Sequence, residues 1–235
     1  MDTLDKLKKE IMIVFVICLI AGFGYIREAI IPTSAIPENF KTVIIDPGHG
    51  GFDGGAGAAD GTLEKDINLQ ISLKTRDFLS FYGYNVIMTR TDDTGTEDDS
   101  SASISLRKKS DLKNRLELMG EYVDSVYVSI HLNKFTTSSV SGAQVFYSPG
   151  FSEAKQLGEH IQGTIISLLQ PFNHRTVKMG SDSTYLLKNA TIPAVIVECG
   201  FLSNQDELNK LKDNNYQNDL AFCIASGVTK YYLGQ

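Results

Sequence analysis

The sequence contains no tryptophan and only three cysteines among its 235 residues. The absence of tryptophan removes the side chain that most often stacks on sugar rings, which counts against a simple carbohydrate-binding module. Cys18, Cys199 and Cys223 lie in apolar surroundings and lack the paired spacing of a zinc finger or a disulfide framework. Any metal in this chain would therefore have to be held by histidine and carboxylate side chains.

An excess of basic charge is also missing. The chain has 22 Lys and Arg against 28 Asp and Glu, which gives a formal net charge of -6. A protein that neutralises nucleic-acid phosphates needs a clustered surplus of Lys and Arg, and no such cluster is present. We therefore expect no nucleic-acid partner. No internal repeat is visible, and the length suits one large domain after a short N-terminal segment.

The N-terminal segment predicts export from the cytoplasm. Residues 11–26 are uncharged and follow Lys6, Lys8 and Lys9, which place the N-terminus inside. A helix of this length spans about 24 Å, a little under the ~30 Å hydrocarbon core of a bilayer. Residues 33–35 resemble a cleavage site, so both a retained anchor and a removed signal stay open. We expect a cytoplasmic N-terminus at 1–10, the transmembrane or signal segment at 11–26, a linker at 27–40, and a globular domain at 41–235 that is membrane-anchored or secreted.

The pattern of that domain is typical of an α/β fold. Strands are predicted at 42–46, 84–89, 125–130, 142–147, 184–188 and 193–198, and helices at 64–82, 105–121, 152–169 and 216–232. Strands alternating with helices of this length predict a three-layer single domain. Its sheet should be twisted, about six-stranded and mostly parallel or mixed, with helices on both faces. The composition of the polar, acidic stretch 91–103 predicts a solvated, mobile loop. A calcium-binding loop is the alternative, although the residues lack the spacing and the terminal Glu of an EF-hand.

Two apolar runs end in a histidine. The run that begins at Val43 leads to His49 within Asp-Pro-Gly-His-Gly-Gly, and the run that begins at Val126 ends at His131. In open α/β sheets, ligands and chemistry collect just outside the carboxyl ends of the strands. Both imidazoles are therefore predicted to lie on one rim, as a candidate metal pair.

A metal pair of this kind needs a carboxylate. A catalytic zinc usually takes three protein ligands and keeps one position for water. Glu64 begins the helix after the His49 loop, with Thr62 as a candidate cap, and its side chain should point back to the same rim. The alternative is an acid that only complements the helix dipole. Asp53, Asp60 and Asp66 are competing ligands.

A further carboxylate, Glu198, ends a buried strand. Because burying an isolated charge is costly, this group should be paired, protonated or functional. It could act as a base beside a zinc-bound water, or it could form a salt bridge with Arg90 or Arg115. His160 and His174 are placed outside the site, since each lies in a segment expected to face solvent.

Six segments together resemble the zinc-dependent N-acetylmuramoyl-L-alanine amidases, in order from about residue 41 to 232. They are Ile45-Asp46-Pro47-Gly48-His49-Gly50-Gly51, Leu63-Glu64-Lys65-Asp66, Met88-Thr89-Arg90, Ser129-Ile130-His131-Leu132-Asn133, Ser141-Gly142-Ala143-Gln144 and Val197-Glu198-Cys199-Gly200-Phe201-Leu202-Ser203-Asn204. The resemblance implies that residues 41–235 form a zinc amidase catalytic domain. It also implies that His49, Glu64 and His131 hold Zn²⁺ and that Glu198 is the catalytic acid and base. Cys199 stands where the family usually has an apolar residue, and we expect it to be a buried packing residue.

The resemblance also implies a substrate and partners. The substrate is peptidoglycan, cut at the amide between the lactyl group of N-acetylmuramic acid and the L-alanine of the stem peptide. The wording of these motifs is most similar to the germination-specific, spore-cortex branch of the family. In that branch, this cleavage precedes formation of the muramic lactam in the intermembrane space of a developing spore. We expect membrane contact through the N-terminal segment and control by an accessory envelope protein. The alternatives are a zinc peptidase acting within stem peptides and a non-catalytic cell-wall binding module.

Overall fold

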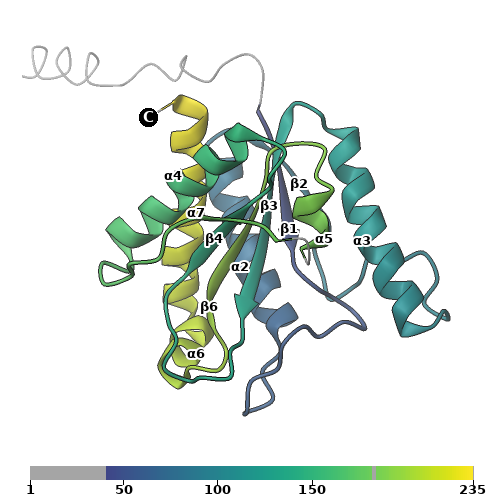
Figure 1. Ribbon diagram of the computed structural model, residues 1–235, viewed down its shortest axis with the longest axis horizontal. Helices are drawn as coiled ribbons and strands as arrows, with labels where there is room; N and C mark the ends of the chain where they lie inside the picture. The colour runs from purple at the N-terminus through teal and green to yellow at the C-terminus, as the bar shows by residue number, and fades with distance from the viewer. Residues whose placement is uncertain (1–40, 182–183, 235) are drawn as a thin grey trace, which may run out of the picture. The chain divides into compact units, whose positions relative to one another are not determined.

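The computed structural model describes residues 41–181 and 184–234, which form one mixed sheet with helices around it (Figure 1). The strands are β1 (Thr42–Pro47), β2 (Asn85–Met88), β3 (Ser125–Asn133), β4 (Gln144–Tyr147), β5 (Lys178–Met179) and β6 (Ala194–Phe201). The helices are α2 (Glu64–Phe81), α3 (Ile104–Glu121), α4 (Ser152–Leu168), α5 (Tyr185–Lys188), α6 (Gln205–Lys212) and α7 (Asn214–Leu233).

The strand order brings the ends of β1, β3 and β6 to one rim. The sheet runs β2-β1-β3-β6-β4-β5. Strands β2, β1, β3 and β6 are parallel, whereas β4 runs antiparallel to β6 and parallel to β5. Loops that leave the three central strands therefore meet at the same edge, where chemistry collects in open α/β sheets.

Alternating apolar side chains give the sheet two buried faces. On β1, Val43 and Ile45 face one core cluster, to which α2, α4 and α7 contribute. Ile44 between them faces a smaller cluster that includes residues of α3 and α5. A strand that is apolar on both faces is typical of a buried parallel sheet. The predicted three-layer α/β domain with a six-stranded mixed sheet is confirmed.

Two local predictions are wrong. Residues 184–188 form the short helix α5 instead of a strand, and the sixth strand is the two-residue β5. Leu186 and Leu187 are both buried in the helix, so a short apolar run did not distinguish the two structures. Thr62 is not the cap of α2, because Leu63 occupies the N-cap position and no side chain caps it. The helix α6 was not predicted.

The predicted membrane or signal segment at 11–26, the N-terminus at 1–10 and the linker at 27–40 lie outside the described residues. Within 41–181 and 184–234, no helix combines the length and apolar character needed to cross a bilayer.

The acidic stretch 91–103 is more firmly held than a solvated loop would be. Asp93 accepts hydrogen bonds from the Gly51 amide at 2.9 Å and from the Lys65 ammonium at 2.7 Å. Glu97 pairs with Arg107 at 2.6 Å. The loop therefore connects the turn that carries His49 with α2 and α3 through hydrogen bonds and an ion pair. Its acidic composition did not predict these contacts.

Candidate active site

His49 lies in a turn whose backbone is unusual. Its φ is 62°, a left-handed conformation that is uncommon outside glycine. Gly48 before it has no room for a side chain, because a Cβ atom there would lie 2.3 Å from the ring of His131. The Arg90 guanidinium holds the turn by donating hydrogen bonds to the carbonyls of Pro47 at 2.9 Å and Gly48 at 3.1 Å. Such strain persists only where surrounding contacts hold it, and it is common at functional sites.

A buried ion pair supports the same turn. Asp46 is fully buried at the end of β1 and pairs with Arg115, which also donates to the His49 carbonyl at 2.8 Å. The hydroxyls of Thr89 and Ser129 donate to the same carboxylate at 2.6 and 2.5 Å. Burial alone would raise the pKa of Asp46, but Arg115 and these hydroxyls lower it to about 2.

This ion pair predicts a pH-dependent stability. A carboxylate with a depressed folded-state pKa contributes stability above its unfolded pKa of ~3.9, and the contribution is lost as pH falls toward the folded value. We expect Asp46→Asn to be less stable than the wild type at pH 6, and the difference to shrink by about 2 kcal/mol between pH 5 and pH 2. Urea unfolding of both proteins at several pH values measures this. A difference that does not change with pH would contradict it.

The two histidines and Glu64 converge at the rim. The imidazole rings of His49 and His131 lie 4.9 Å apart between centroids and are nearly perpendicular. Glu64 Oε1 lies 3.3 Å from His49 Nε2 and 3.0 Å from His131 Nδ1. One ligand atom from each of the three lies within 4.8 Å of the others, and among the described residues this is the one such group of His, Cys, Asp or Glu. The prediction that both histidines share one rim is confirmed, and the structure brings Glu64 to them.

Glu64 is held in place by its own helix start and by neighbouring backbone. Its Oε2 accepts from the Ala56 amide at 2.8 Å, and its Oε1 accepts from the Leu132 amide at 3.0 Å and the Asn68 side chain at 3.3 Å. Burial opposes its charge, but the bonds with His131 and His49 hold the pKa of Glu64 well below its usual range. An ionised, buried carboxylate between two imidazoles provides a site for a cation.

The competing carboxylates do not belong to the group formed by His49, Glu64 and His131. Asp53 Oδ2 is 3.0 Å from His49 Nδ1, on the side of the ring away from Glu64. Despite burial, the bonds to Asp53 and Glu64 raise the pKa of His49 to about 9. Asp60 pairs with Lys212 at 2.8 Å and Asp66 is exposed on α2. Asp53 therefore orients His49 in the way that carboxylates orient metal-binding histidines.

Glu198 lies beside this group. It is the register partner of His131 in the pairing of β3 with β6, and its Oε2 is buried without a hydrogen-bond partner among the described residues. Burial is the main cause that raises the pKa of Glu198 to about 7. The alternative salt bridge is absent from the described residues, because Arg90 binds backbone carbonyls and Arg115 binds Asp46 and Asp111. An acid with a pKa near neutrality can both take and give a proton.

The remaining candidates are outside the group. Cys199 is fully buried in the larger core cluster, and burial raises the pKa of its thiol well above the usual value. It is the packing residue that we expected. His160 lies within α4, and His174 lies in the segment before β5.

Comparison with known proteins agrees with this arrangement. Residues 43–230 match the family model described as N-acetylmuramoyl-L-alanine amidase. The chain belongs to this family. It is therefore an enzyme of the amide-hydrolysing class, and its similarity to the germination-specific members is confirmed.

Individual relatives share most of their length with this chain. It is 35% identical over 198 residues to the germination-specific N-acetylmuramoyl-L-alanine amidase of Bacillus subtilis, covering 84% of this chain and 82% of the relative. It is 41% identical to the CwlD amidase of Clostridioides difficile, solved in complex with the GerS lipoprotein. That match has a TM-score of 0.79 and covers 83% of this chain and all of the other. A second amidase structure, from Clostridium difficile 630, is 33% identical with a TM-score of 0.72, over 84% and 99% of the two chains.

The contact of Asp53 with the His49 ring was not predictable from the sequence pattern. Asp53 lies four residues after His49 and was considered only as a competing ligand. The geometry of the turn sets which carboxylate contacts Nδ1 of the His49 ring and which contacts Nε2. Spacing in the sequence alone therefore did not separate Asp53 from Glu64.

Proposed function

We propose that this amidase is zinc-dependent, with His49, Glu64 and His131 as the metal ligands and Glu198 as the catalytic acid and base. It would cut the amide between the lactyl group of N-acetylmuramic acid and the L-alanine of the stem peptide. The observation that carries the proposal is the placement of Glu198, whose buried Oε2 has no hydrogen-bond partner among the described residues, beside two imidazoles and a carboxylate that share one small space.

The donor set fits zinc. Two imidazoles and one carboxylate, with room left for a fourth ligand, is a common set of protein ligands for catalytic zinc. The ring of His49 also has the carboxylate partner that such ligands need on their other nitrogen. When bound, zinc would supply Lewis acidity to the carbonyl and to the attacking water.

Glu198 would move the proton. Its carboxylate, placed beside the proposed ligands, can accept a proton from the attacking water and then donate it to the leaving nitrogen of L-alanine. No salt bridge among the described residues holds this carboxylate, and its buried Oε2 has no hydrogen-bond partner there.

The bond that is cut separates this proposal from its alternative, a zinc peptidase acting within stem peptides. We expect zinc-loaded protein to convert purified muropeptides into glycan with a free lactyl carboxylate and an intact stem peptide that begins with L-alanine. Mass spectrometry of the products measures this, with the Glu198→Ala protein as the inactive control. Products shortened within the stem peptide would contradict the proposal and favour the peptidase.

The biological setting is proposed from the relatives. The similarity to germination-specific amidases supports a role in the spore cortex, where the cleavage would precede formation of the muramic lactam. Residues 41–235 would form the catalytic domain outside the cytoplasm, and residues 11–26 would be an anchor or a removed signal. The CwlD relative in complex with a lipoprotein supports control of this chain by an accessory envelope protein.

A further inference from the structure

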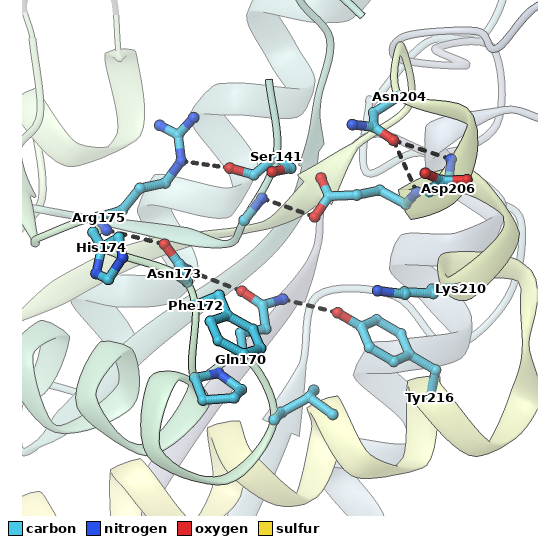
Figure 2. A pocket seen from close by; sticks show the side chains of 14 residues that line it. Ser141, Gln170, Phe172, Asn173, His174, Arg175, Asn204, Asp206, Lys210 and Tyr216 are labelled. Atoms are coloured by element: carbon cyan, nitrogen blue, oxygen red, sulfur yellow. Dashed lines mark hydrogen bonds between the residues drawn. The ribbon is translucent and has the colours of Figure 1, made fainter. Parts of the chain in front are cut away.

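A polar cavity of about 590 Å³ lies near the end of the sheet that carries the candidate active site (Figure 2). It is bounded by the turn before β4, the segment between α4 and β5, α6 and the start of α7. Arg175, His174 and Lys210 contribute basic groups to its lining. None of these residues belongs to the proposed metal and acid-base machinery.

Arg175 is connected to that machinery across the sheet. His131, Glu198 and Gln144 are register partners on the adjacent strands β3, β6 and β4. Register partners point to the same face, so the Gln144 side chain lies on the face of Glu198. Arg175 Nη1 donates to Gln144 Oε1 at 3.0 Å, and its guanidinium lies over the ring of Phe201, three residues beyond Glu198 on β6. At about 3.3 Å per residue along a strand, this places the guanidinium on the order of 10 Å from Glu198.

The guanidinium of Arg175 is fixed and keeps a free edge. Its Nε donates to the Ser141 carbonyl at 2.9 Å, and the group lies 4.9 Å from the centre of the Phe201 ring. Nη2 has no hydrogen-bond partner among residues 41–181 and 184–234, and no carboxylate there lies within ion-pair distance. The nearby Glu207 is occupied by the amides of Gly142 and Phe201, at 2.8 Å each.

A preorganised arginine that forms no ion pair among the described residues is suited to bind a carboxylate, because its planar donors are already oriented and little entropy remains to be lost. Peptidoglycan stem peptides carry free carboxylates beyond their L-alanine. An extended peptide advances about 3.3 to 3.6 Å per residue, so a carboxylate on the second residue falls roughly 7 to 10 Å beyond the bond that is cut. This matches the separation of Arg175 from Glu198.

Resting on the amidase function proposed above, we propose that Arg175 forms a subsite for the free α-carboxylate of the second residue of the stem peptide. The peptide would run from Glu198 toward the end of β6 and place this carboxylate against Nη2 of Arg175, between Phe201 and Gln144. The subsite would then select substrates by charge, since amidation of that carboxylate removes the group that the guanidinium recognises.

The test compares two muropeptides that differ only at this carboxylate, which is free in one and a primary amide in the other. We expect zinc-loaded wild-type protein to cleave the carboxylate form with a kcat/KM roughly tenfold higher than the amide form, chiefly through KM, because charge-assisted hydrogen bonds are strong. Arg175→Gln should bring this ratio close to one. Lys210→Gln, a change to a neighbouring cation in the same cavity, and Arg76→Gln, on the exposed side of α2, should keep the wild-type ratio.

The outcomes are distinct. A lower ratio in Arg175→Gln with unchanged zinc content supports the subsite. The subsite is rejected if Arg175→Gln slows both substrates equally, if the wild type shows no preference, or if Lys210→Gln removes the preference instead. If the wild type releases no intact stem peptide from either substrate, the amidase function fails and the subsite fails with it.

Discussion

Replacing Glu198 with alanine is expected to reduce kcat roughly 10²- to 10⁴-fold while bound zinc stays at the wild-type level. The reason is the separation of roles in the site. Glu198 lies beside the three proposed ligands, and the group of mutually close ligand atoms does not include it. Its buried oxygen without a partner serves no structural contact among the described residues. Loss of the carboxylate therefore removes the proton acceptor and leaves the ligand set intact.

Zinc content by plasma mass spectrometry and turnover on muropeptides measure the two properties separately. Glu198→Gln, which keeps the shape and removes the charge, should behave like Glu198→Ala. The matched control is Cys199→Ala in the next position of β6, whose side chain packs in the core and should be dispensable for both properties. A Glu198→Ala protein that is free of zinc would show that Glu198 is a ligand, against the proposed roles.

Replacing His49 with alanine is expected to abolish both zinc binding and turnover. His49 supplies one of the three proposed ligands, so its loss should weaken zinc affinity by more than the roughly 10- to 100-fold that removal of an outer partner costs. The backbone of His49 is left-handed, with φ of 62°, so alanine also adds strain there. His49→Asn separates these effects, because asparagine tolerates this conformation.

Zinc affinity is measured by competition with a chelating dye, and cobalt substitution gives an absorption spectrum that does not depend on activity. Both His49 variants should lose the cobalt spectrum, whereas His160→Ala on α4 should keep it. Thermal unfolding of the metal-free proteins controls for folding. A His49→Asn protein that binds zinc as tightly as the wild type would remove His49 from the ligand set.

The sequence predicted the shared rim and its two histidines, but it left Asp53, Asp60 and Asp66 as competing ligands beside Glu64. His49 and His131 each follow an apolar β-branched run, and parallel strands must end at the same edge. Glu64 and Glu198 could be placed there by the same logic of helix starts and strand ends. The family resemblance added the substrate, which no spacing of residues contains.

Other features depend on tertiary contacts that the sequence does not display. The run at 184–188 forms a helix where a strand was predicted. The sequence did not distinguish the two, because two adjacent leucines can be buried in either structure. The acidic loop at 91–103 is anchored by partners far along the chain, such as Lys65 and Asp111. The position of Arg175 near the site could not be predicted either, because it depends on the antiparallel pairing of β4 with β6, which places Gln144 next to Glu198.

We propose that His49, Glu64 and His131 hold one zinc ion and that Glu198 lies outside its ligand set. Anomalous diffraction from crystals of the zinc-loaded protein at the zinc absorption edge tests this directly. We expect one strong peak about 2.0 to 2.2 Å from a nitrogen of each histidine and an oxygen of Glu64, with the Glu198 carboxylate not coordinated. A peak at another place, or a metal coordinated by Glu198 in place of Glu64, would show that the proposed ligand set is wrong.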